Sequence, residues 1–155
     1  MNKKIILTTL VFVLLISIMI FASCNSLKDL GKQDPQIGEK EVTVFIGNDE
    51  YNVKTNANYL HELLIELSTK GEIVYEYSDG PYGASISKVN GLETSLTWNP
   101  YISIYHSIDD ISLKDMSGYM DNITRNDTTF YPSGVGVESI PILSGEKYLL
   151  VEISY

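Results

Sequence analysis

The chain has 155 residues and a formal net charge of −9, from 20 acidic and 11 basic side chains. An acidic chain is a poor candidate for nucleic-acid binding, because that binding depends on neutralising phosphates with lysine and arginine. Arg125 is the only arginine and Cys24 the only cysteine, so a disulfide within the chain is also excluded.

The N-terminus has the layout of a secretory signal peptide. Lys3 and Lys4 precede an apolar run over residues 5–21, and the run ends in Ala22-Ser23-Cys24. This small-small-Cys ending resembles the bacterial lipoprotein signal, which implies that Cys24 is acylated, as with palmitate, and becomes the new N-terminus. The alternative is an uncleaved anchor helix, since 17 residues reach the lower end of a membrane span. Both interpretations place the remainder on the extracytoplasmic face of the cell membrane.

Three regions follow from this layout. Residues 1–23 are predicted to be a lipoprotein signal peptide, and residues 24–40 the lipidated cysteine with a flexible, polar tether. Residues 41–155 are then one globular domain, long enough to bury a core of its own. Without residues 1–23 the chain keeps 20 acidic and 9 basic side chains, a net charge of −11.

The first part of the domain predicts a strand pair followed by a helix. Residues 41–47 alternate with Val42, Val44 and Ile46 on one face, and Asn48-Asp49 predicts a turn into a return strand over residues 51–54. Leucines at positions 60, 63, 64 and 67 predict an amphipathic helix over residues 59–70. We expect Asn56 or Asn58 to cap its start and Gly71 to end it.

The middle of the domain predicts a strand over residues 73–77 and then a hairpin. Asn90-Gly91 between two alternating runs is a strong hairpin signal, because both turn residues need positive φ. A third run covers residues 101–105. We expect the rest of the domain to pack around the stretch 80–105.

The last part predicts an insertion and a closing strand. Within residues 107–129, helical spacing of Leu113, Met116, Met120 and Ile123 predicts one short helix, although Gly118 interrupts it. Ser144-Gly145 is a turn signal, and residues 148–154 read as the terminal strand.

This order predicts an α+β fold, a mixed sheet with one main helix on one face. The segments Tyr82-Gly83, Val89-Asn90-Gly91, Trp98 and the run 136–148 resemble a bacterial domain of unknown function that is similar to the C-terminal β-domain of transcobalamin and intrinsic factor. The resemblance implies a β-grasp-like fold and a recognition role. The vertebrate relatives use this domain to cover a corrinoid beside a helical barrel, and this chain has no such barrel. The resemblance therefore implies an extracytoplasmic, β-rich recognition module for a small-molecule ligand or an envelope protein partner more directly than it implies corrinoid binding.

Catalysis and metal binding find little support in the sequence. The two histidines, His61 and His106, belong to no hydrolase or zinc-protease motif. Acidic and amide pairs at 109–110, 121–122 and 126–127 supply oxygen ligands of the kind calcium takes, but without the loop spacing of a calcium site. We therefore expect a chain that is not an enzyme and needs no cofactor or metal.

The tyrosines offer the better clue. Alternation places Tyr101 and Tyr105 on one face of their strand and Ile102 and Ile104 on the other. If the isoleucines face the core, the tyrosines face outward and form, with Tyr82 and Trp98, a candidate ligand-binding set. The alternative is a second small core beneath the insertion.

Two functions remain open. One is a lipid-anchored module that recognises a ligand or an envelope protein partner and is associated with uptake. The other is a structural or adhesive envelope module without a small-molecule ligand.

Overall fold

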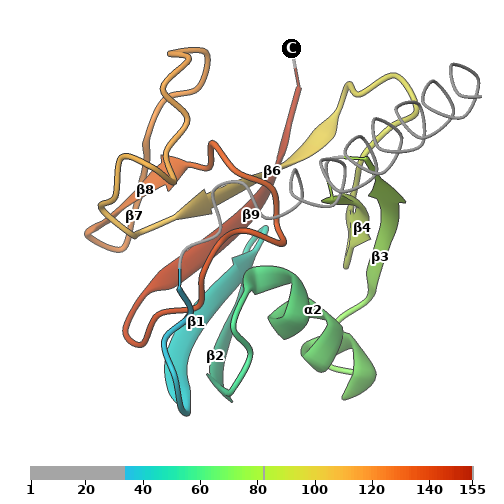
Figure 1. Ribbon diagram of the computed structural model, residues 1–155. Helices are drawn as coiled ribbons and strands as arrows, with labels where there is room; N and C mark the ends of the chain where they lie inside the picture. Colours follow the sequence, from blue (N-terminus) through green and yellow to red (C-terminus); the bar gives the residue numbers. More distant parts are fainter. Residues whose placement is uncertain (1–33, 82, 155) are drawn as a thin grey trace, which may run out of the picture. The chain divides into compact units, whose positions relative to one another are not determined.

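The computed structural model describes residues 34–81 and 83–154, which form two sheets and one helix (Figure 1). The predicted signal peptide, Cys24, most of the tether and Tyr82 lie outside the described residues. The predicted mixed sheet with one main helix is confirmed for the part of the chain that is described.

The larger sheet has six strands in the order β2-β1-β9-β6-β8-β7. These are β2 (Asp49–Thr55), β1 (Lys40–Ile46), β9 (Lys147–Ile153), β6 (Tyr101–His106), β8 (Thr128–Pro132) and β7 (Ile123–Arg125). Strands β1 and β9 run parallel, and the other neighbours run antiparallel. The C-terminal strand β9 lies between β1 and β6, at the centre of this sheet. The expectation that the domain packs around the Asn90-Gly91 hairpin is therefore wrong.

The β1–β2 hairpin follows its apolar pattern. Val42, Val44 and Ile46 are buried on one face, as predicted from the alternation. The turn lies at Gly47-Asn48, one residue earlier than predicted, because Gly47 adopts the left-handed conformation that the turn requires, with φ of 57°.

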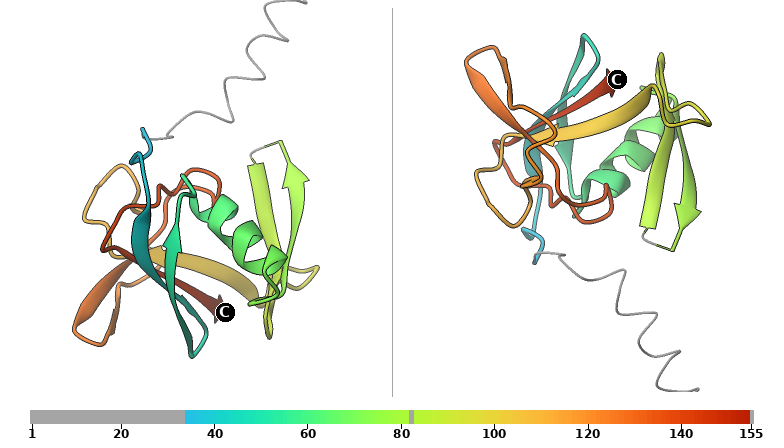
Figure 2. Two further views of the ribbon diagram at one scale, coloured as in Figure 1. Left: turned by 90° about the horizontal axis from the view of Figure 1, so that it is seen from below. Right: turned by 90° about the horizontal axis from the view of Figure 1, so that it is seen from above.

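Helix α2 (Leu60–Thr69) packs on one face of the larger sheet, as the leucine spacing predicts. All four of its leucines are fully buried, at positions 60, 63, 64 and 67. Figure 2 shows the helix between the β1–β2 hairpin and the smaller sheet. Gly71, with φ of 75°, follows the C-cap as predicted.

The predicted asparagine cap of α2 is wrong. The N-cap is Tyr59, whose side chain makes no capping hydrogen bond. Instead, the first amides of the helix are satisfied by a distant loop: the Leu60 amide donates to the Ile140 carbonyl at 2.9 Å and the His61 amide to the Val137 carbonyl at 3.2 Å. A tertiary contact thus replaces the local cap, which sequence spacing alone does not reveal.

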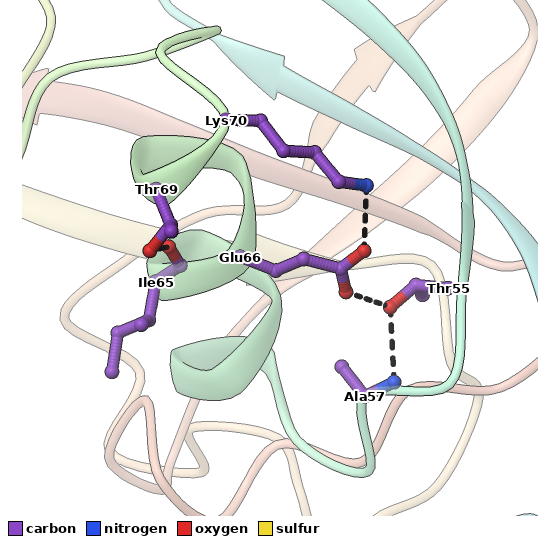
Figure 3. Close-up of polar contacts among 6 residues, drawn as sticks. All are labelled: Thr55, Ala57, Ile65, Glu66, Thr69 and Lys70. Atoms are coloured by element: carbon purple, nitrogen blue, oxygen red, sulfur yellow. Dashed lines mark hydrogen bonds and ion pairs between the residues drawn. The ribbon is translucent and has the colours of Figure 1, made fainter.

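Glu66 joins the exposed edge of α2 to the end of β2 (Figure 3). Its carboxylate accepts a hydrogen bond from the Thr55 hydroxyl at 2.5 Å and one from the Lys70 ammonium at 2.7 Å. The Thr55 hydroxyl oxygen in turn accepts from the Ala57 amide at 2.9 Å. These contacts lower the pKa of Glu66, chiefly through the hydrogen bond from Lys70.

The smaller sheet contains β3 (Tyr75–Gly80), β4 (Gly83–Val89) and β5 (Leu92–Glu93). The turn at Asn90-Gly91 is confirmed, with Asn90 at φ of 50°. The chain leaves this sheet after only two residues of β5, so the hairpin is short. Strand β3 starts two residues later than predicted, because Ile73 is buried in the core ahead of it.

The insertion contains a second hairpin and not the predicted helix. Strands β7 and β8 join at Asn126-Asp127, where both residues have positive φ, of 49° and 56°. Two consecutive positive values are typical of a type I′ hairpin turn. Gly118 also has positive φ, of 75°, and this conformation interrupts the spacing that suggested a helix.

Arg125 fastens this second hairpin to the first. Its guanidinium donates to the Gly47 carbonyl at 2.7 Å and to the Asn48 carbonyl at 3.1 Å, and it lies 4.3 Å from the centre of the Phe45 ring. The only arginine of the chain therefore has a structural role, capping the turn of another hairpin.

The end of the predicted tether belongs to the domain. The Ser144 amide donates to the Gln36 side-chain oxygen at 2.8 Å. Lys40, assigned to the tether, is the first residue of β1, is 1% exposed, and donates from its ammonium to the Gln36 carbonyl at 2.6 Å. The expectation of a free tether up to residue 40 is therefore wrong at these two positions.

Candidate functional site

The three expected binding residues that the structure describes do not form one site. Tyr82 lies outside the described residues. Trp98 is in the loop before β6, while Tyr101 and Tyr105 are in β6 itself. Trp98 and Tyr101 line two different hollows, and Tyr105 is buried.

Tyr105 belongs to a second core, so the expectation of an outward-facing Tyr105 is wrong. Its side chain is 3% exposed and packs with Phe45, Phe130 and Leu149 on the sheet face opposite α2. The rings of Phe45 and Phe130 meet edge to face at 5.9 Å. The alternation itself is correct, since Ile102 and Ile104 contribute to the core on the helix side. Phe130 of β8 and Ile123 of β7 pack on the opposite face, which matches the alternative of a second small core beneath the insertion.

Tyr101 lies at the open end of the same face and lines a hollow of about 570 Å³. We call this hollow the Tyr101 pocket; its lining residues are Tyr101, Asp115, Ser117, Tyr119, Met120, Ile153 and Ser154. The volume falls within the range of small-molecule sites, roughly 300–1,000 Å³. Its walls come from β6, from the end of β9 and from the insertion.

The polar and apolar groups of the Tyr101 pocket are mixed. The Tyr101 hydroxyl donates to the Met120 sulfur at 3.3 Å, and the Ser103 hydroxyl approaches the same sulfur at 3.5 Å. Tyr119 extends from the rim and is 92% exposed. A thioether and two phenol rings provide an adaptable apolar surface, while hydroxyls and the Asp115 carboxylate provide groups that orient a ligand.

The acidic loop over residues 110–117, next to the Tyr101 pocket, is stabilised by hydrogen bonds between its own residues. The Asp110 carboxylate accepts from the amide and hydroxyl of Ser112, both at 2.8 Å, and the Asp115 carboxylate accepts from the amide and hydroxyl of Ser117 at 2.9 and 2.7 Å. These are turn-stabilising contacts. Among residues 34–81 and 83–154, no group of three or more His, Cys, Asp or Glu side chains is arranged to hold a metal ion.

Sequence reasoning missed most of this pocket. Of its lining residues, the sequence predicts only Tyr101 as a binding residue, and the helical spacing places Met120 in a helix. A usable signal was Gly118, since a glycine inside an apparent helical repeat favours a loop that can fold back on a strand.

Trp98 lines a smaller groove of about 170 Å³ between the two sheets, with Ile86, Ile102 and Val137 among the lining residues. Its side chain is 60% exposed, and its φ of 60° is unusual for an aromatic residue. Residues 94–100 form the loop that presents it, which we call the tryptophan loop.

The two histidines have structural surroundings. The His61 Nδ1 is 2.8 Å from the Tyr75 hydroxyl, and its ring meets Tyr77 edge on at 4.5 Å. Burial raises the pKa of Tyr75 well above its usual range. His106 is fully buried in β6, with its Nε2 3.1 Å from the Leu113 carbonyl and its Nδ1 without a hydrogen-bond partner. Burial lowers the pKa of His106.

Within residues 34–81 and 83–154, no helix has the length and apolar character needed to cross a bilayer.

Comparisons with known proteins show similarity of fold. No protein-family model matches the sequence, and no curated protein matches it significantly. The structure is similar to haptocorrin, solved in complex with Cbi, with a TM-score of 0.53 and 12% identity over 79% of this chain and 27% of haptocorrin. A candidate metal-binding protein from Ruminococcus gnavus gives a TM-score of 0.48 and 16% identity over 76% of this chain and 97% of its own. The described domain therefore shares a fold with about a quarter of the haptocorrin chain.

Proposed function

We propose that this protein is a lipid-anchored, extracytoplasmic recognition module with a β-grasp-like domain that binds a small molecule in the Tyr101 pocket. The β-grasp-like assignment is supported by the order of the elements. The β1–β2 hairpin is followed by helix α2, and the last strand, β9, runs parallel to β1. In this proposal the domain binds its ligand and does not act as an enzyme. A substrate-binding component associated with uptake fits this arrangement.

The Tyr101 pocket is the observation that carries the proposal. Binding sites for small molecules are concave and mostly apolar, with a few polar groups that fix orientation. The Tyr101 pocket has this character: Met120 and Ile153 supply apolar surface, and Tyr101, Ser117 and Asp115 supply hydroxyl and carboxylate groups.

Similarity of fold to haptocorrin supports a ring-shaped, amphipathic ligand as the first class to test. That protein was solved in complex with Cbi, and this chain aligns with 27% of its length. The remainder of haptocorrin has no counterpart in the match, so a corrinoid is one probe among several. Nucleosides and sugars share the combination of a ring face and polar edges that tyrosine side chains recognise.

Two exposed side chains on the insertion provide a matched test. Tyr119 lines the Tyr101 pocket and is 92% exposed, while Ile111 is 70% exposed and does not line it. A thermal-shift screen with cobalamin, nucleosides and sugars identifies a stabilising probe. Tyr119→Ser is expected to weaken binding of that probe about tenfold, or roughly 1.4 kcal/mol, and Ile111→Ser to leave it unchanged. Equal loss in both variants would argue against the Tyr101 pocket.

The anchor is tested at Cys24. The apolar run over residues 5–21 followed by Ala22-Ser23-Cys24 supports lipidation. Cys24→Ala is expected to abolish incorporation of labelled palmitate and to leave the protein uncleaved or released. Normal lipid incorporation in this variant would contradict the proposed anchor.

The second candidate is a structural or adhesive envelope module without a small-molecule ligand. Burial of Tyr105 favours it, because half of the expected aromatic face is filled by the second core. This function predicts that no probe in the screen stabilises the domain and that Tyr119→Ser behaves like the wild type in every binding assay.

A further inference from the structure

We propose that the tryptophan loop, residues 94–100, inserts Leu96 and Trp98 into the outer layer of the lipid bilayer to which the chain is anchored. The inference rests on the proposed lipid anchor, which keeps the domain near a membrane, and it is independent of the Tyr101 pocket. The contact gives the tethered domain a second attachment point.

The loop displays two large apolar side chains in water. Leu96 is fully exposed, and Trp98 is 60% exposed. The part of Trp98 that is not exposed belongs to the groove that it lines with Ile86 and Ile102. Two neighbouring apolar side chains at the tip of one loop cannot bury the area of a stable protein interface, but they suit the headgroup region of a bilayer, where tryptophan is enriched.

Three backbone amides of the loop donate to partners within the loop. The Ser95 amide donates to the Pro100 carbonyl at 2.9 Å, and the Trp98 amide donates to the Ser95 carbonyl at 3.0 Å. The Asn99 amide donates to the Ser95 hydroxyl oxygen at 2.9 Å. Internal partners reduce the cost of moving these amides out of water, since an unsatisfied polar group in an apolar medium is unfavourable.

The absence of charge in the tryptophan loop also favours contact with a lipid bilayer. The tryptophan loop contains no charged residue, although the chain without residues 1–23 carries a net charge of −11. An acidic domain is repelled by anionic headgroups, so an uncharged loop is the part that can approach them. Attachment through the anchor also raises the local concentration of the loop at the bilayer, so a weak contact suffices.

Trp98 reports directly on this contact because it is the only tryptophan of the chain. The full-length chain is reconstituted into phosphatidylcholine vesicles, with or without bromine on the acyl chains, and association is checked by flotation. Brominated lipid is expected to quench Trp98 emission, and the emission maximum in plain vesicles is expected to lie at shorter wavelength than for a water-exposed indole.

The variants Leu96→Ser and Ile111→Ser form a matched pair, since both remove an exposed apolar side chain. Leu96→Ser is expected to reduce the quenching markedly and Ile111→Ser to leave it unchanged, while both proteins still float with the vesicles. A wild-type chain that floats but is not quenched, or a Leu96→Ser variant quenched like the wild type, overturns this inference alone. A chain that does not float overturns the proposed anchor as well, whereas binding at the Tyr101 pocket is unaffected by either result.

Discussion

The Tyr101 hydroxyl and the Met120 sulfur lie 3.3 Å apart, and this contact connects the insertion to the end of β6. Met120 is 19 residues beyond Tyr101 in the chain, so the contact closes a loop that contains the acidic turns at Asp110 and Asp115. The Tyr101 pocket exists because the insertion returns to the strand at this point.

Helix α2 should contribute strongly to stability through its buried face. Leu64 is fully buried, so Leu64→Ala is expected to lower the free energy of unfolding by about 2–5 kcal/mol. The adjacent Ile65 is 38% exposed and serves as the control, since Ile65→Ala should cost much less. Urea denaturation of the chain without residues 1–24 measures both. Similar losses for the two variants would show that the packed face is misassigned.

Tyr105 should behave as a core residue. Its ring is 3% exposed within the second core, so Tyr105→Ser is expected to cost about 3–5 kcal/mol, as for other large aromatic truncations. Tyr101→Ser removes a half-buried ring at the edge of the sheet and should cost clearly less. Thermal and urea unfolding measure the loss of stability in the two single variants. If Tyr105→Ser were as stable as the wild type, Tyr105 would not be a core residue.

His106 should make stability depend on pH. Burial lowers its pKa in the folded domain, while the unfolded chain takes up a proton near the ordinary value of about 6.5. Below that pH the unfolded state binds more protons, so the free energy of unfolding should fall as the pH falls, by at most about 1.4 kcal/mol per pH unit. The hydrogen bond to the Leu113 carbonyl opposes this lowering of the His106 pKa, as does Glu146 to a smaller extent, and the nearby Lys114 adds to the lowering.

The variant His106→Gln isolates this contribution. A glutamine amide can donate to the Leu113 carbonyl, as His106 is placed to do, but does not titrate in this range. Unfolding curves between pH 7 and pH 5 should therefore be less steep in pH for the variant. Parallel pH profiles for the two proteins would contradict the role assigned to His106.

Gln36 should stabilise the domain although it belongs to the predicted tether. Its side-chain oxygen accepts from the Ser144 amide, so Gln36→Ala is expected to cost about 0.5–1.5 kcal/mol. The neighbouring Ile37 is 96% exposed, and Ile37→Ala is the control without an expected loss. Chemical denaturation measures the free energy of unfolding of both variants. If Gln36→Ala were as stable as the wild type, the segment around Gln36 would not contribute to the stability of the domain.

Local patterns predicted the regular part of the fold. Alternation located β1, leucine spacing located α2, and Asn90-Gly91 located a turn, because each of these signals is short-range. The failures came from tertiary contacts: the start of α2 is satisfied by the Ile140 carbonyl, and the insertion is tied to β6 by Met120. Neither partner can be inferred from spacing, so most of the Tyr101 pocket could not be predicted.

The claim that a small molecule binds in the Tyr101 pocket is tested most directly by measuring the affinity of one stabilising probe for the wild type and two variants. Isothermal titration of the probe from the thermal-shift screen is carried out on the wild type, Tyr119→Ser and Ile111→Ser. If the probe binds in the Tyr101 pocket, the wild type and Ile111→Ser should bind it with the same affinity, and Tyr119→Ser should bind it about tenfold more weakly. Equal affinity in all three proteins, or the absence of any stabilising probe, would contradict a ligand site at the Tyr101 pocket.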